Sequence, residues 1–496
     1  MNIADIMPFS VLVPLIAAPV CALLPGRRLP WLLCQVSALA SLVIAALTLP
    51  AALEGTLSYA FGNWDPPIGI EYRVDAANAL VALLLTAMAT LILPWGRLTV
   101  DQEVPERQGT FYALFLLVLA GLLGITLTGD AFNVFVFLEI SSLATYGLIA
   151  HGRDRRALLA AFRYLVMGTV GATFFLIGVG FLYIMTGTLN MADLAERLPA
   201  VADTRTVRVA LAFIVVGMAL KLAMFPLHLW LPNAYTYAPT FVTAFLAATA
   251  TKVALYVMLR FIFTVFAPDY SFVALPLATV FLLLALAGMF AGSWVAMFEQ
   301  NLKRMLAYSS VAQVGYMVLG VSLVSVLGLT ASLLHLFNHA LMKAALFMAL
   351  GAVIYRTGGV QLANLRGLGR EMPWTFAAFA LAGLSLIGIP PTAGFISKWT
   401  LISAALEAGQ GWLVALIVIT SMMAVIYIAR VVETVWFQPR PEGAAAVREA
   451  PLQLLIPVWV MVAANFYFGI DTRLTLGTAT AAAEALMGGT VSGGLQ

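Results

Sequence analysis

Long apolar stretches alternate with short polar segments along the whole chain of 496 residues. A stretch of about 18 or more apolar residues is long enough to cross a bilayer as a helix, and about fourteen stretches meet this condition. We predict spans at 5–24, 30–50, 75–96, 109–128, 131–150, 158–186, 206–224, 238–264, 271–296, 301–323, 326–354, 374–402, 411–436 and 452–470. The pattern therefore predicts an all-α polytopic membrane protein.

Prolines interrupt the seventh and twelfth predicted spans. Pro226, Pro232 and Pro239 follow the apolar part of the seventh span, and Pro390 and Pro391 lie inside the twelfth. Each proline removes a backbone donor and disfavours helix at the residue before it. A broken helix is tolerated at membrane depth only where it is buried in protein or lines a water-filled cavity. We therefore expect both spans to be discontinuous and to border an ion path.

The two broken spans occupy matching positions in the chain. Lys221 and Lys252 flank the first break, and Lys398 and Arg430 are separated by almost the same length of chain. Paired segments interrupted by proline in two halves of a chain point to the site of a transporter. We predict two inverted five-helix repeats, spans 4–8 and 9–13. The domains are 1–107 with the first three spans, 108–264 and 270–437 with one repeat each, and 438–496 with the last span and the tail.

Composition places the chain in the membrane class. It is 62% hydrophobic and only 10% charged, against about 25% charged in soluble domains, and its mean hydropathy is +0.99. The net charge of +3 is too small to indicate nucleic-acid binding. The first apolar run follows Asp5 and precedes Arg27 and Arg28, whereas a secretory signal carries its positive charge before the apolar run. We expect a retained first helix.

Basic residues are distributed unequally between the two sets of loops. Loops after odd-numbered spans hold 14 arginines and lysines, Lys303 and Arg304 among them, whereas loops after even-numbered spans and the tail hold 6. Cytoplasmic loops carry the excess of basic residues. We therefore assign the odd loops to the cytoplasm, Lys303 and Arg304 to the inner surface, and both termini to the outside of a bacterial inner membrane.

Two segments outside the spans allow two interpretations each. The Gly- and Pro-rich FGNWDPPIGIEYRVD between the second and third spans fits a short surface hairpin or a plain solvated connector. The tail from residue 473 onward, with its TATAAAEALMGG, fits a short surface helix or a disordered segment.

Glu139, Lys221 and Lys252 are charged residues set in apolar sequence within the predicted spans of the first half. A charge within a span costs about 2.5–3.5 kcal/mol on insertion scales, so it usually marks a function. Lys221 and Lys252 are flanked by long apolar runs, so their ammonium groups cannot easily snorkel to the surface. Desolvation disfavours the charged form of a lysine and lets it exchange protons near neutral pH. Glu139 is interpreted as the partner that sets when Lys221 holds its proton, or alternatively as a structural hydrogen-bond acceptor between helices.

A second set of ionisable residues lies on one helix of the second half. His335, His339 and Lys343 are spaced i, i+4, i+8, which forms a polar stripe about 12 Å long. We interpret it as a proton relay, because no third ligand supports a metal site. Lys398, after IGIPPTAGFIS, either ends this line of charges or lies at the water interface. His228, in the first broken segment, fits a gate or a hydrogen-bonded residue equally well.

The sequence indicates no cofactor. Cys21 and Cys34 lie in apolar stretches without CxxC spacing and are interpreted as buried packing residues. The phosphate-binding patterns GxxxxGK[ST] and GxGxxG are absent. We therefore expect no nucleotide, redox or metal cofactor, and a transporter subunit rather than an enzyme. Its transport must be driven by an ion gradient or by partner subunits.

These features resemble the antiporter-like subunits shared by complex I, membrane-bound hydrogenases and Mrp-type cation/proton antiporters. The resemblance is carried by Glu139 in NVFVFLE, Lys221 before FPLHLWLPNAYTYAP, Lys252 in KVALYVMLR, and the segments LKRMLAYSSVAQVGYM, HLFNHALMKAALFMALGAV and IGIPPTAGFISKW. FGNWDPPIGI, LTGDAFNVFVFLE and MTGTLNMADLA further resemble the D-type group of the Mrp antiporter proteins. YTYAP departs from the family's pattern, in which a histidine and an acidic residue are common at this place.

The resemblance implies fourteen helices with two inverted five-helix repeats and a polar axis along the middle of the membrane. It also implies a proton path that consists of Glu139 with Lys221, then Lys252, His335, His339 and Lys398. The leading hypothesis is a proton-translocating subunit of a multi-subunit Na⁺/H⁺ antiporter, which contacts other membrane subunits, protons, Na⁺ and the lipid bilayer. One alternative is a membrane-arm subunit of a complex I-like NADH:quinone oxidoreductase or a membrane-bound hydrogenase complex. The other is a structural scaffold whose charges merely pair.

Overall fold

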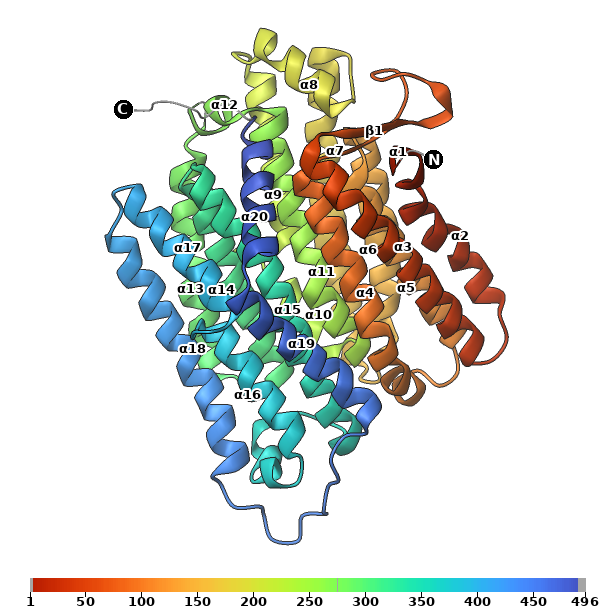
Figure 1. The fold of residues 1–496 in the computed structure, drawn as a ribbon, viewed down its shortest axis with the longest axis vertical. Helices are drawn as coiled ribbons and strands as arrows, with labels where there is room; N and C mark the ends of the chain where they lie inside the picture. Colours follow the sequence, from red (N-terminus) through yellow and green to blue (C-terminus); the bar gives the residue numbers. More distant parts are fainter. Residues whose placement is uncertain (1–2, 274, 489–496) are drawn as a thin grey trace.

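The computed structural model describes residues 3–273 and 275–488, and Figure 1 shows a bundle of long helices with a small hairpin at one end. Within these residues, 12 helices are long and apolar enough to cross a membrane. The predicted all-α polytopic membrane fold is confirmed.

Each predicted span overlaps at least one helix, and the helices are numbered in chain order. The first half contains α1 (Ile3–Ile6), α2 (Phe9–Leu23), α3 (Arg28–Glu54), α4 (Ala76–Glu103), α5 (Gln108–Leu127), α6 (Ala131–Ala150), α7 (Arg156–Thr186), α8 (Met191–Arg197), α9 (Arg205–Leu222), α10 (Trp230–Tyr237) and α11 (Thr240–Leu259), which continues as the π-helix η3 (Arg260–Val265). The second half contains α12 (Pro268–Val273), α13 (Leu277–Phe298), α14 (Leu302–Ser322), α15 (Val326–Thr357), α16 (Pro373–Ile387), α17 (Ala393–Glu407), α18 (Trp412–Trp436), α19 (Leu452–Ile470) and α20 (Arg473–Leu486).

Both spans that were predicted to be discontinuous are interrupted. α9 ends at Leu222 and α10 begins only at Trp230. In the same way, α16 ends at Ile387 and α17 begins at Ala393. The last carbonyl groups of a helix have no partner within that helix. Each break therefore leaves carbonyl oxygens inside the bundle that can accept hydrogen bonds from side chains.

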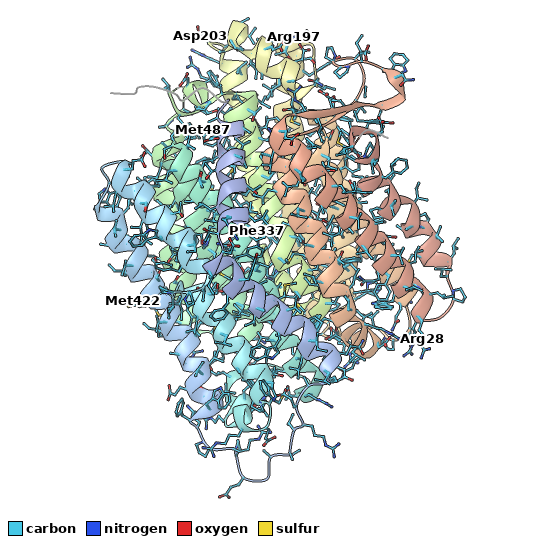
Figure 2. The ribbon with its side chains drawn as sticks, in the orientation of Figure 1. Arg28, Arg197, Asp203, Phe337, Met422 and Met487 are labelled. Carbon is cyan, nitrogen blue, oxygen red and sulfur yellow. The ribbon has the colours of Figure 1, made fainter. Side chains whose placement is uncertain are left out.

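Helices α11, α14 and α15 form the centre of the bundle. In each of the three, 94% of the apolar window that would cross the membrane is buried, against 33% in α18 and in α19. Side chains of α18 such as Met422 project outward (Figure 2). Polar side chains on the three central helices are therefore shielded from lipid by the rest of the protein.

The two segments with open interpretations both have regular structure. The outer connector is a hairpin of antiparallel strands, β1 (Leu57–Ala60) and β2 (Glu71–Val74), with Leu57 paired to Val74. The tail forms α20, which packs against α4 and α15 and buries Ala482. Its far end lies at the same end of the molecule as β1 and α8 (Figure 1). The part of the tail up to residue 488 is thus an integrated helix, neither disordered nor confined to the surface.

Candidate functional site

The first part of the site is the end of α9, where Lys221 occupies the last turn before the break. Lys221 is 6% exposed, and its ammonium donates a hydrogen bond to the Oγ of Ser142 on α6 (2.7 Å). Glu139 lies one turn earlier on α6, and its Oε1 has no hydrogen-bond partner among the described residues. Among the described residues, no direct hydrogen bond joins this carboxyl group to the ammonium of Lys221.

Gly168 on α7 makes the space around Lys221. A Cβ at this position would collide with the hydroxyl group of Tyr146 and would lie 3.5 Å from the Nζ of Lys221. A side chain here would therefore displace Tyr146 or the lysine. The absence of a side chain at residue 168 is what lets α7 approach this site so closely.

A small cavity of about 30 Å³ separates Lys221 from α11. Its polar lining consists of Ser141, Ser142, Thr145, Tyr164 and Lys221. This volume accommodates one or two water molecules, since one molecule needs about 10–15 Å³ of accessible space and two to four polar partners. Val253 forms part of the opposite wall, and the next residue back along α11 is Lys252. The cavity therefore extends the site from α9 toward α11, although the side chain of Lys252 does not line it.

Lys252 is fully buried where α11 packs against α15. Its ammonium donates a hydrogen bond to the carbonyl of Ala247. Helix α15, against which this part of α11 packs, carries His335, His339 and Lys343. The structure thus brings a lysine of the first predicted repeat next to the polar stripe of the second.

The stripe of α15 is entirely buried. The rings of His335 and His339 stack with their centroids 6.1 Å apart and an angle of 9° between their planes. The Nδ1 of His335 lies 2.8 Å from the Oγ of Ser397, and its Nε2 lies 2.9 Å from the Oε1 of Gln313. Both ring nitrogens of His339 lack a partner within the described part of the chain. His335 is therefore held in one orientation, whereas His339 is not anchored by hydrogen bonds of its own.

Lys398 lies in α17, directly after the second break. Its Nζ donates hydrogen bonds to the carbonyls of Leu386 and Ile387 at 3.1 and 2.8 Å, and to the Oγ of Ser421 at 3.0 Å. The two carbonyls belong to the last turn of α16, which the break leaves without helical partners. Because Lys398 is 5% exposed, it is buried in this structure and does not lie at an exposed interface.

Helix α14 supplies partners that sequence reasoning missed. Ser309 accepts a hydrogen bond from an ammonium group (2.5 Å), Gln313 bonds an imidazole, and the ring of Tyr316 lies 4.6 Å from a third cationic nitrogen. Their partners are, in order, Lys343, His335 and Lys398. The three α14 residues are spaced i, i+4, i+7, which places them on one helix face. That spacing, visible in LKRMLAYSSVAQVGYM, is the signal that could have found them.

His228 lies in the first broken segment and is 8% exposed. Its ring stacks on Phe225 with the centroids 5.3 Å apart, and its Nδ1 has no partner among the described residues. The described contacts therefore include no hydrogen bond between His228 and Lys221, Lys252, Lys398 or the stripe of α15. Among the same residues, no group of three or more His, Cys, Asp or Glu side chains could hold a metal ion.

Two broken helices and a buried row of lysines and histidines between them define a polytopic membrane protein with a protonatable core. The chain belongs to the NADH:quinone oxidoreductase/Mrp antiporter transmembrane family, whose model matches residues 128–424. The family resemblance seen in the sequence is confirmed.

Both branches of that resemblance have relatives of this chain. It is 44% identical to the N-type subunit of NADH-quinone oxidoreductase from Desulforudis audaxviator, over 91% of this chain and 93% of the relative. It is 33% identical to the D-type subunit of the Na⁺/H⁺ antiporter from Alkalihalophilus pseudofirmus, over 86% of each protein. A chain in the structure of the Mrp complex from Dietzia sp. superposes with a TM-score of 0.90 at 28% identity, covering 99% of this chain and 98% of that one.

Proposed function

We propose that this chain translocates protons as a membrane subunit of a hetero-oligomeric Na⁺/H⁺ antiporter in the bacterial inner membrane. The observation that carries the proposal is the buried row that runs from Lys221 through Lys252 and the α15 stripe to Lys398. Ionisable residues inside a membrane are costly, and those that persist mark ion or proton paths. The row crosses from the first predicted repeat to the second, so a proton could pass along the membrane plane between the two broken helices.

The bonding of the lysines favours proton transfer over a scaffold role. A scaffold would pair its buried charges, because an unpaired buried charge is strongly destabilising. Among the described residues, none of the lysines of the row forms an ion pair, and each donates to carbonyl or hydroxyl oxygens instead. Neutral acceptors hold both the protonated and the neutral lysine. Each lysine can therefore gain or lose a proton without breaking an ion pair.

Glu139 is proposed as the switch of the first half. Glu139 lies one turn of α6 from Ser142, which accepts the hydrogen bond of Lys221, so a change of charge at the carboxyl group would alter the affinity of that lysine for a proton. Variants Lys221→Ala and Glu139→Gln should each reduce Na⁺/H⁺ exchange by about a hundredfold or more, the range lost when a proton-transferring group is removed. Exchange is measured in inverted membrane vesicles that contain the whole complex.

A matched control is Glu196→Gln, which makes the same substitution at an exposed carboxylate in α8. It should exchange at the rate of the unmodified complex. Exchange that persists in an assembled complex with Lys221→Ala would contradict proton translocation by this row.

A second candidate is a proton-pumping membrane-arm subunit of a complex I-like or hydrogenase-type complex. The 44% identity to the relative from NADH-quinone oxidoreductase favours it. The same row would then be driven by electron transfer in partner chains. Subunits that copurify with a tagged chain distinguish the two: small membrane subunits without cofactors indicate the antiporter, and Fe–S or quinone-reducing subunits indicate the redox complex.

A further inference from the structure

Lys303 is a buried cation outside the row just described. It is the second residue of α14 and is only 5% exposed, so it lies beneath the surface of the end that the sequence assigns to the cytoplasm, and that assignment stays a prediction. Its ammonium donates a hydrogen bond to the carbonyl of Ala238 (2.8 Å), and the described residues give it no ion pair. A protonated lysine has three N–H donors. Two of them are therefore left for water.

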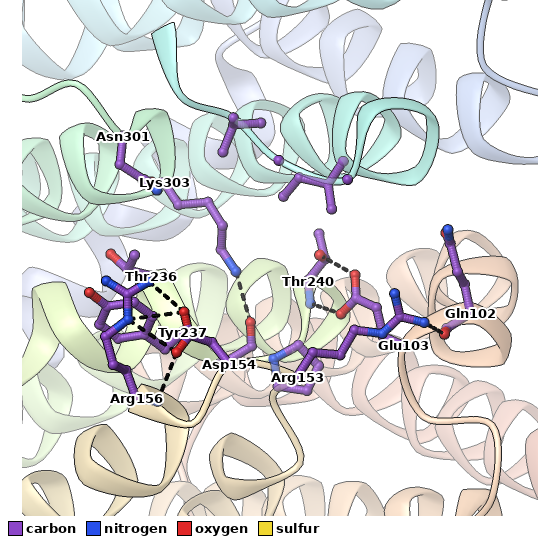
Figure 3. A pocket seen from close by; sticks show the side chains of 16 residues that line it. Gln102, Glu103, Arg153, Asp154, Arg156, Thr236, Tyr237, Thr240, Asn301 and Lys303 are labelled. Carbon is purple, nitrogen blue, oxygen red and sulfur yellow. Dashed lines mark hydrogen bonds and ion pairs between the residues drawn. The ribbon is translucent and has the colours of Figure 1, made fainter. Parts of the chain in front are cut away.

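Lys303 lines a cavity of about 220 Å³ at the end of the molecule that carries Arg153 and Arg156. The ends of α4 and α15 and the connections α6–α7, α10–α11 and α13–α14 line it. Figure 3 shows the side chain of Lys303 reaching across from α14, with Thr240 and Glu103 beside it. Since water occupies roughly 30 Å³ per molecule, the cavity has room for several molecules.

The other ionisable groups of this cavity are already engaged. They are Glu103, Arg153, Asp154, Arg156 and Tyr237. Glu103 accepts hydrogen bonds from the backbone N–H and the hydroxyl of Thr240 (2.7 and 2.5 Å), at the first residue of α11. The hydrogen bonds from Arg156 hold the pKa of Asp154 below its usual range, so this carboxylate stays charged at neutral pH. Arginine does not release its proton in proteins. Lys303 is thus the cation of the lining that can change its protonation state.

Helix α14 connects this cavity with the buried row. Leu306 lies three residues beyond Lys303, about 4.5 Å along the helix axis. The carbonyl of Leu306 accepts a hydrogen bond from the ammonium of Lys343 (2.7 Å), which also donates to Ser309. The cavity and the stripe of α15 are therefore separated by about one turn of a single helix.

A different cation, Arg260, lies at the opposite end of α11. A cavity of about 260 Å³ lies there, but Arg260 donates to both carboxylate oxygens of Asp75 (2.7 and 2.8 Å) and to the hydroxyl of Tyr256 (3.2 Å). A paired arginine neither accepts nor releases protons at physiological pH. The cavities at the two ends of the helix that carries Lys252 therefore differ among the described residues: one holds a buried lysine without an ion pair, and the other holds a paired arginine.

We propose that the cavity at Lys303 is a water-binding site for proton uptake, with Lys303 as the first acceptor and Lys343 as the next. A neutral Lys303 takes a proton from a hydronium ion in the cavity and leaves a water molecule behind. The resulting ammonium releases that proton, through water, to the neutral amine of Lys343 and becomes neutral again. This site deepens the proposed proton translocation and rests on it.

The test compares two conservative variants in the complete complex. Lys303→Arg keeps the charge and a donor for the carbonyl of Ala238 but cannot give up its proton. We expect it to slow Na⁺/H⁺ exchange in inverted vesicles by at least about tenfold, the low end of the loss from a blocked proton transfer. Arg304→Lys, at the neighbouring residue that pairs with Glu299, should leave the rate unchanged. An assembled Lys303→Arg complex with an unchanged rate would overturn the proposal.

A labelling experiment decides the question without measuring transport. A cysteine at position 303 (Lys303→Cys) should react with a membrane-impermeant thiol reagent in inverted vesicles and not in intact cells. The native Cys21 and Cys34 are fully buried and give little background. No reaction from the cytoplasmic face would overturn the uptake site. If Lys221→Ala abolishes exchange while Lys303→Arg does not, the uptake site fails and the proposed function stands; exchange that survives Lys221→Ala removes the proposed function itself.

Discussion

At the scale of single residues, the adjacent serines Ser309 and Ser310 of α14 differ in one contact, because only Ser309 bonds a lysine of the buried row. Ser309 donates to the carbonyl of Leu306 and also accepts from the ammonium of Lys343 (2.5 Å). Ser310 donates only to the same carbonyl, among the contacts of the described residues. Both are buried and of equal size. The pair therefore isolates the contribution of one hydrogen bond to a cation.

We predict that Ser309→Ala slows exchange by about tenfold or more, because a hydrogen bond to a charged group contributes roughly 1.5–3 kcal/mol. The position of the Lys343 ammonium would be less well defined without it. Ser310→Ala, which removes an intrahelical bond alone, should leave the rate within error of the unmodified complex. Equal rates for the two variants would show that Ser309 does not hold Lys343 for transport.

At the scale of elements, the helix breaks position the lysines. The second break turns the end of α16 into a pair of acceptors for Lys398, since the carbonyls of Leu386 and Ile387 have no helical partner. Gly388 makes the turn possible with φ 91, a conformation that residues with a Cβ adopt at a cost. A Cβ at Gly388 would also lie 2.9 Å from the Cδ of Lys398. Backbone geometry and lysine position are therefore coupled at one residue.

Gly388→Ala is predicted to impair exchange and stability together. The backbone strain costs about 1–2 kcal/mol, and the added methyl group displaces the side chain of Lys398 from its acceptors. Gly409→Ala is the matched control, because Gly409 has φ +68 but no atom within 4 Å of the added Cβ. It should lower the melting temperature of the purified complex by a similar amount and leave exchange intact. Equal exchange rates in the two variants would show that transport does not depend on the position of the Lys398 side chain.

These elements also show what the sequence can and cannot reveal. The prolines and the charges of Lys221, Lys252 and Lys398 were visible because they contradict their apolar surroundings. Arg430, whose spacing from Lys398 matches that of Lys252 from Lys221, donates to the carbonyls of Met297 and Glu299 at the end of α13. The neutral partners Ser309, Gln313 and Tyr316 were missed because uncharged side chains conflict less with apolar surroundings than charges do, so only their common helix face marks them. Their contacts depend on the rotation of one helix against another, which composition does not encode.

At the scale of the whole molecule, the two ends differ in charge and in chemistry. The arginine-rich loops gather at the end that holds the Lys303 cavity, whereas β1, α8 and the end of α20 lie at the other end (Figure 1). The excess of basic residues predicts that the first end is cytoplasmic. The two cavities at the ends of α11 would then face opposite compartments, with a lysine toward the cytoplasm and a paired arginine toward the outside.

This orientation can be tested with reporter fusions to the full chain. Alkaline phosphatase folds only outside the cytoplasm, so it should be active when fused behind α20. It should be inactive when inserted into the exposed segment 441–446 between α18 and α19, and green fluorescent protein should give the reverse pattern at both positions. Phosphatase activity at 441–446 would show that the orientation in the membrane is the reverse of the predicted one. The cavity at Lys303 would then open to the outside, and uptake from the cytoplasm would have to begin elsewhere.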